Sequence, residues 1–148
     1  MPDTRIASTS AGRSTVQRRL ATELEFLLGR WSSVGGSTPG QPDCQRSFER
    51  VLEDTCLRMT AAWRLGAVRY EEHAYLTLDA DGRLQWWAFA SDGRHSFGSE
   101  DDVSDIHPRA VGFSARLSDG AARQAWWRSD EGVLHWVVET RSGTGWRR

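Results

Sequence analysis

Few residues in this 148-residue chain have the types and spacing that catalysis or metal binding requires. Glu72 and His73 are adjacent, so in a strand their side chains point to opposite faces and cannot act together. His95, His107 and His135 lie in separate segments, without the short spacing that is typical of metal sites. The sequence therefore predicts no metal site and leaves Glu72 as the candidate for acid–base chemistry.

An acidic run also needs an interpretation. Glu100, Asp101, Asp102 and Asp105 predict a loop that ends at His107. The run lacks the central glycine of a calcium loop, so a solvated loop is favoured over a cation site. No G-x-S-x-G, P-loop or dinucleotide-binding glycine pattern occurs, which argues against serine-nucleophile, phosphate and dinucleotide chemistry.

The overall composition is that of one folded domain, with 39% hydrophobic and 26% charged residues. A formal net charge of −1 implies no bulk attraction to nucleic acid or to an anionic membrane. The nineteen basic residues are all arginine, which a GC-rich genome would explain, so their abundance does not indicate phosphate binding.

We expect two regions along the chain. Residues 1–16 predict a disordered lead-in, and residues 17–148 a single domain. The lead-in lacks the apolar core and A-x-A site of a secretory signal, and no apolar run is long enough for a membrane helix. A cytoplasmic location is therefore expected.

Apolar spacing predicts a helix over Gln17–Leu28, ended by Gly29. After it, turn signals that contain glycine recur every ten to fourteen residues or so, which is typical of a hairpin meander. The fold class expected is all-β: a nine- or ten-stranded antiparallel meander, closed into a barrel with the short helix as its plug. The expected strands are 30–37, 44–52, 56–65, 68–78, 83–91, 94–99, 109–117, 121–128 and 133–141, with a further one at 145–148.

The register of the central hairpins predicts which side chains point inward. A two-residue turn at Gly66-Ala67 places Trp63 opposite Tyr70 and Ala61 opposite Glu72. A turn around Glu53-Asp54 brings Arg46, Phe48, Arg50 and Leu52 to the same face. Glu72 then forms a buried ion pair with Arg46 or, with a raised pKa, serves as a general acid or ligand anchor. The same register holds Cys44 and Cys56 too far apart for a disulfide, which predicts two free thiols.

The pairs Trp86-Trp87 and Trp126-Trp127 each place one indole on either side of the sheet. The inner rings either stack on a flat ligand or fill the interior. The outer rings either form an apolar patch suited to a homodimer or lie under loops and arginine side chains.

Three stretches resemble a known group of proteins. Leu24–Trp31, with its Gly29-Arg30-Trp31, resembles the opening of calycin (lipocalin-like) barrels, in which a short helix precedes the first strand. The stretches 70–87 and 134–146 are similar to bacterial barrels related to the nitrobindins. The resemblance implies an apolar cavity, and a late arginine over Trp31, for which Arg141, Arg147 and Arg148 are available. Nitrobindins hold haem through a histidine in their final strand, whereas Gly143–Arg148 contains none, so no cofactor is predicted.

The function expected is the binding of a small hydrophobic or aromatic molecule inside the barrel. One alternative is a small-barrel enzyme, an isomerase, cyclase or hydrolase of an apolar substrate with Glu72 as acid or base. Another is a module that recruits a partner through its outer tryptophans. The predicted ligand-binding residues are Arg46, Trp63, Tyr70, Glu72, Trp86, Trp126 and Trp136.

Overall fold

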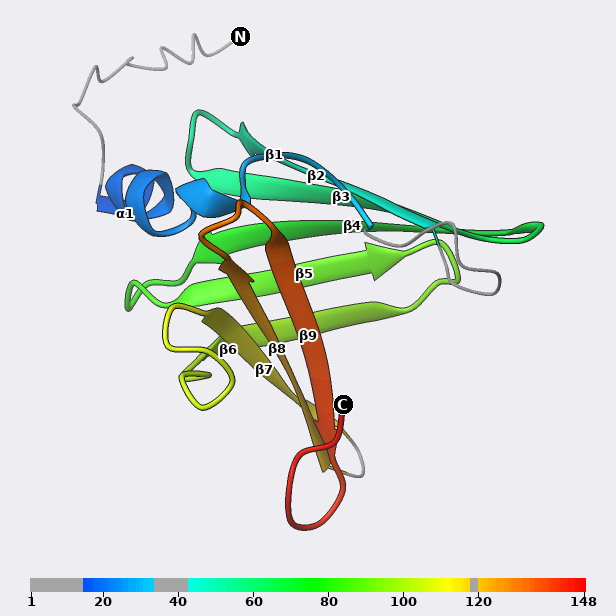
Figure 1. Ribbon diagram of the computed structural model, residues 1–148. Helices are drawn as coiled ribbons and strands as arrows, with labels where there is room; N and C mark the ends of the chain where they lie inside the picture. The colour runs from blue at the N-terminus through cyan, green and yellow to red at the C-terminus, as the bar shows by residue number, and fades with distance from the viewer. Residues whose placement is uncertain (1–14, 34–42, 118–119) are drawn as a thin grey trace, which may run out of the picture.

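One antiparallel sheet makes up most of the protein, and its nine strands pair in the order in which they follow along the chain (Figure 1). The computed structural model describes residues 15–33, 43–117 and 120–148. The expected meander is confirmed, with most strand ends within two residues of the prediction. The strands are β1 (Gly29–Ser32), β2 (Asp43–Val51), β3 (Cys56–Leu65), β4 (Val68–Leu78), β5 (Leu84–Ala90), β6 (His95–Asp101), β7 (Val111–Leu117), β8 (Gly120–Arg128) and β9 (Leu134–Arg141).

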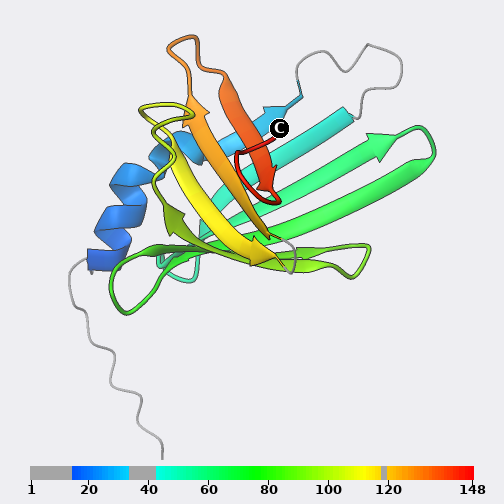
Figure 2. The same ribbon diagram turned by 90° about the horizontal axis from the view of Figure 1, so that it is seen from below.

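The sheet curls strongly into a half-barrel, so its strands wrap around a common space, the lumen (Figure 2). The expected barrel closure is only partial. Among the described residues no backbone pairing joins β1 to β9, which are the two ends of the strand order. An open seam therefore runs between the first and last strands.

The C-terminal residues fold back on β9. Thr140 and Arg147 exchange two backbone hydrogen bonds of 2.9 Å each, and this single bridge replaces the strand expected over 145–148. In an antiparallel ladder the N–H and C=O of one residue point to the same side. Arg147 therefore lies on the edge of β9 away from β8, where it occupies part of the edge that a closing strand would need.

A short helical segment closes one end of the half-barrel (Figure 1). It consists of helix α1 (Thr15–Glu23) and the 3₁₀ turn η1 (Glu25–Leu27). Leu20, Leu24 and Leu27 are 2%, 0% and 1% exposed, because they pack into the core between the strands. The expected plug is confirmed. The lead-in expected over residues 1–16 lies outside the described residues, except for Thr15 and Val16 in α1.

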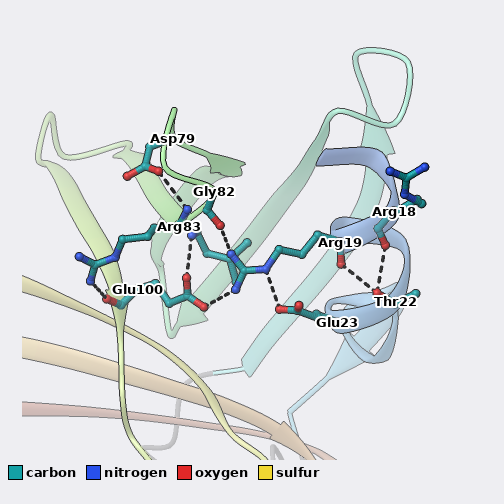
Figure 3. Close-up of polar contacts among 9 residues, drawn as sticks. Arg18, Arg19, Thr22, Glu23, Asp79, Gly82, Arg83 and Glu100 are labelled. Atoms are coloured by element: carbon teal, nitrogen blue, oxygen red, sulfur yellow. Dashed lines mark hydrogen bonds and ion pairs between the residues drawn. The ribbon is translucent and has the colours of Figure 1, made fainter. Parts of the chain in front are cut away.

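A polar cluster fastens α1 to the turn between β4 and β5 and to the end of β6 (Figure 3). Arg19 donates to the carbonyl of Gly82 and forms an ion pair with Glu100. The second oxygen of Glu100 accepts the backbone N–H of Leu84 at 2.9 Å. Glu100 was expected in a solvated loop; instead it lies within β6, one residue before the strand ends, and ties the plug to the sheet.

The register of the central hairpins is confirmed. Trp63 pairs with Tyr70, Ala61 pairs with Glu72, and Arg46 pairs with Ala61. The prediction was wrong for Leu52, which is 69% exposed in the turn between β2 and β3. The chain reverses there before Leu52 can continue the inward row.

The segment between β6 and β7 covers the outer face of β7 and β8. Val103 is 1% exposed and packs so closely over Gly112 that a Cβ there would meet it at 2.4 Å. Asp105 binds Arg123, and His107 stacks on Trp127 at 4.9 Å. The carboxylates of Asp101, Asp102 and Asp105 are exposed, as expected for a solvated loop, while Val103 and His107 of the same segment cover this face.

Candidate functional site

A pocket of about 680 Å³ opens along the seam between the two ends of the sheet. We call it the seam pocket. Its walls come from strands that are distant in sequence, because the curl brings the first three and the last two together. Its principal lining residues are Trp31 (β1), Arg46 (β2), Trp63 (β3), Trp126 (β8), Leu134 and Trp136 (β9).

Arg46 lies among three indole rings of this pocket. The guanidinium carbon is 5.1 Å from the ring centre of Trp63, 4.9 Å from that of Trp126 and 4.4 Å from that of Trp136. Such contacts stabilise a desolvated cation by about 2 kcal/mol or more. The three rings therefore partly compensate for the burial of this charge.

The guanidinium of Arg46 lacks hydrogen-bond acceptors in the part of the chain that the structure describes. Among the described residues Arg46 has no hydrogen-bond or ion-pair partner, and its Nε is sealed from solvent without an acceptor. Burial lowers the pKa of Arg46, and the electrostatic attraction of Cys44 and Glu72 offsets only part of that effect.

The ion pair expected between Arg46 and Glu72 does not form, although their backbones share one cross-strand row through Ala61. Glu72 instead lines a second cavity of about 220 Å³, which we call the lumen cavity. Burial raises the pKa of Glu72, and the charges of Arg46 and Arg94 oppose that shift. Trp136 lines both cavities, the seam pocket with Arg46 and the lumen cavity with Glu72.

Gln124 fixes the orientation of two of the indoles. Its Oε1 accepts the Nε1–H of Trp126 and that of Trp136, both at 3.2 Å. Gln124 did not appear in the sequence prediction. The signal that could have found it is its position two residues before Trp126, on the same inward row.

Of the remaining predicted ligand-binding residues, some line the seam pocket and others do not. Trp86 is 4% exposed, packs between Phe113 and Trp126 with ring centres 5.7 Å from each, and lines the lumen cavity rather than the seam pocket. Trp126 is 1% exposed and forms the floor of the seam pocket. Tyr70 lines neither the seam pocket nor the lumen cavity.

Trp31 belongs to the site although it was expected only as a structural tryptophan. Its Nε1 donates to the carbonyl of Leu27 at 2.7 Å, which fixes the ring at the mouth of the seam. The resemblance implied an arginine over this ring, and one is present, but it is Arg128, at 5.6 Å. Of the arginines expected there, Arg141 stacks on Trp146 and Arg148 pairs with Glu139. Arg128 ends β8, so the curl brings it to β1, whereas the C-terminal arginines follow the fold-back.

These features define a class of protein, an antiparallel half-barrel that is plugged at one end and holds an indole-lined pocket with one cationic side chain. No protein-family model matches the chain, and no curated protein matches its sequence. Among the described residues, no helix is long and apolar enough to cross a membrane.

Proposed function

We propose that the protein binds a small, largely apolar molecule in the seam pocket. The observation that carries the proposal is the pocket itself, about 680 Å³ in volume and lined by the indole rings of Trp31, Trp63, Trp126 and Trp136. Sites for small molecules typically have volumes of about 300–1,000 Å³ and mostly apolar walls with a few placed polar groups. A cytoplasmic location is part of the same proposal.

Tryptophan fluorescence tests this proposal directly, because ligand binding would change the surroundings of Trp31, Trp63 and Trp136. We expect saturable quenching or a shift in emission with at least one flat aromatic or long-chain compound. The panel includes haem, since the sequence resembles the nitrobindins. An unchanged spectrum with every compound would contradict the proposal.

A matched pair of variants tests whether the ligand lies in the seam pocket. Trp136→Phe removes part of the pocket wall, whereas Trp87→Phe changes an outer ring that is 43% exposed. We expect weaker binding by Trp136→Phe and unchanged binding by Trp87→Phe. Equal affinity in both variants would place the ligand elsewhere.

A second candidate function is catalysis in the lumen cavity. It is favoured by Glu72, the carboxyl whose pKa burial raises, because a carboxyl that titrates closer to neutral pH suits acid–base work. Glu72→Gln separates the two functions once a ligand is known. A carrier keeps its affinity within a small factor, whereas an enzyme loses its turnover by orders of magnitude.

The expected outer aromatic patch is present and supports a further proposal, a homodimer. The rings of Trp87 and Phe97 contact each other on the outer face with centres 4.3 Å apart, and Phe89 beside them is 56% exposed. Analytical ultracentrifugation of the wild type and of Phe89→Ser tests it. A concentration-dependent dimer that Phe89→Ser weakens is expected, and a monomer at all concentrations would contradict it.

A further inference from the structure

Two arginines with largely desolvated side chains differ sharply in their partners. Arg123 is 7% exposed and donates to Glu139 at 2.8 Å and to both oxygens of Asp105 at 3.0 and 2.7 Å. Arg46 donates to none of the described residues. The fold therefore supplies anionic acceptors for one guanidinium and leaves the other with aromatic neighbours only.

Indole rings attract the charge of Arg46 but do not offer the oxygen lone pairs that its N–H groups require. A buried donor without an acceptor destabilises the state that contains it. Nε is sealed, so a bound molecule cannot reach it. The terminal nitrogens of Arg46 are not among the sealed atoms, also have no acceptor among the described residues, and can donate to a molecule in the seam pocket that Arg46 lines.

The surroundings of Arg46 restrict the charge of that molecule. Among the described residues that line the seam pocket, Arg46 is the one arginine. Glu72 lies two strands away in the same row and acts electrostatically on Arg46. Arg128 lies over Trp31 at the mouth of the seam and is not among the lining residues, so Arg46 is the guanidinium that a head group inside the pocket meets. The nearby Glu72 disfavours a doubly charged phosphate there, whereas a carboxylate monoanion matches both the single charge and the planar donor fork of Arg46.

We propose that the ligand of the seam pocket is a monocarboxylate, an aromatic or aliphatic acid whose head group accepts hydrogen bonds from Arg46. Its apolar body lies along Trp31, Trp63 and Trp136. This inference rests on the proposed function and adds the chemical class of the ligand.

Two fluorescent probes that share one apolar body test the inference. They are 1-pyrenebutyrate, which carries a carboxylate, and 1-pyrenebutanol, which is neutral. We expect the acid to bind the wild-type protein at least about tenfold more tightly, equivalent to ~1.4 kcal/mol. Equal affinities would overturn the carboxylate inference and leave the proposed function standing. Failure of both probes to bind would contradict both.

Arg46→Met removes the charge and keeps much of the side-chain length. Arg50→Met is its matched control, because Arg50 lies in the same strand and on the same row but is exposed. We expect the preference for the acid to disappear in Arg46→Met and to persist in Arg50→Met. Loss of the preference in both variants, or in neither, would overturn the assignment to Arg46.

A measurement on the wild-type protein tests the inference even if Arg46→Met does not fold well enough for binding to be measured. The buried Nε–H of Arg46 should give a slowly exchanging side-chain signal in a ¹H–¹⁵N spectrum, assigned by its absence from the variant. We expect 1-pyrenebutyrate to shift that signal and 1-pyrenebutanol to leave it nearly in place. The same small shift with both probes would contradict the inference.

Discussion

At the scale of single residues, a network of ion pairs around Arg123 and Glu139 compensates the charges that the fold buries. Glu139 is 6% exposed, accepts hydrogen bonds from Arg123 at 2.8 Å and from Arg148 at 2.9 Å, and thereby joins β8, β9 and the C-terminal residues. Removing one member of a buried pair leaves the other charge uncompensated, which is more costly than the pair itself is stabilising.

We predict that Glu139→Gln lowers the free energy of unfolding by about 2–3 kcal/mol, less than the roughly 3–5 kcal/mol usual for breaking a buried ion pair, because Arg123 keeps Asp105. Glu49→Gln is the control: Glu49 pairs with Arg58 across two strands, but both are exposed to solvent. It should change the stability by no more than about 0.5 kcal/mol. Urea unfolding followed by tryptophan emission measures both. Equal effects would show that burial of the pair is unimportant.

The same carboxyl makes the stability depend on pH. Burial alone would raise the pKa of Glu139, but hydrogen bonds from Arg148 and Arg123 lower it below its ordinary value. A carboxyl with a lowered pKa stabilises the fold above its unfolded pKa, and this contribution disappears as the pH falls through the folded pKa. We therefore predict that the stability difference between wild type and Glu139→Gln, largest near neutral pH, shrinks as unfolding is repeated at acid pH. A constant difference would contradict this.

Glu72 predicts the opposite dependence, because burial raises its pKa. The folded state then holds the proton more tightly than the unfolded state, so Glu72 destabilises the fold as the pH rises above its ordinary pKa. Glu72→Gln should raise the melting temperature near neutral pH and have almost no effect at about pH 4. Calorimetry at the two pH values checks it, and a destabilised variant near neutral pH would contradict it.

At the scale of elements, the turn between β2 and β3 carries backbone strain. Leu52, Glu53 and Asp54 have φ angles of 53°, 54° and 62°, in the left-handed region that side chains with a Cβ disfavour. The sequence predicts a turn here from polarity alone, and no glycine marks its handedness. The position of the turn was therefore predictable, but its conformation was not.

This strain predicts that one substitution has opposite effects at two sites. Leu52→Gly should stabilise the protein by about 0.5–1 kcal/mol, because glycine adopts positive φ freely and Leu52 is largely exposed. Leu65→Gly, in the regular strand β3, should destabilise it by about 1 kcal/mol. Thermal unfolding of the two variants gives the comparison. Destabilisation by Leu52→Gly would show that the turn is not strained.

The sequence predicted local pairing well and distant contacts poorly. The Gly66-Ala67 turn determines its own register, so the rows through Trp63 and Glu72 followed from counting residues. The pairs Arg19 with Glu100 and Arg128 with Trp31 could not follow in that way, because they depend on how far the sheet curls. The curl is the sum of small twists between nine strands, so no single residue in the sequence predicts how large it is.

At the scale of the whole molecule, the open seam makes the two ends of the sheet its least constrained part. Among the described strands, β1 pairs only with β2, and Arg128 over Trp31 is a side-chain contact that joins β1 to the last strands. β5, by contrast, lies between two paired neighbours and contains the buried Leu84 and Trp86. Regions with few paired neighbours open locally at low free-energy cost.

Hydrogen exchange connects this architecture to the proposed binding. Amides of β1 should exchange fastest among the strands, and those of β5 slowest, because local opening at the seam need not disturb the centre of the sheet. A molecule bound in the seam pocket contacts β1 and β9 together. It should therefore slow exchange in both by several-fold, while β5 and β6 remain unchanged. Protection confined to the outer aromatic strands β5 and β6 would mean that the ligand lies on the Trp87 face and that the seam is not the site.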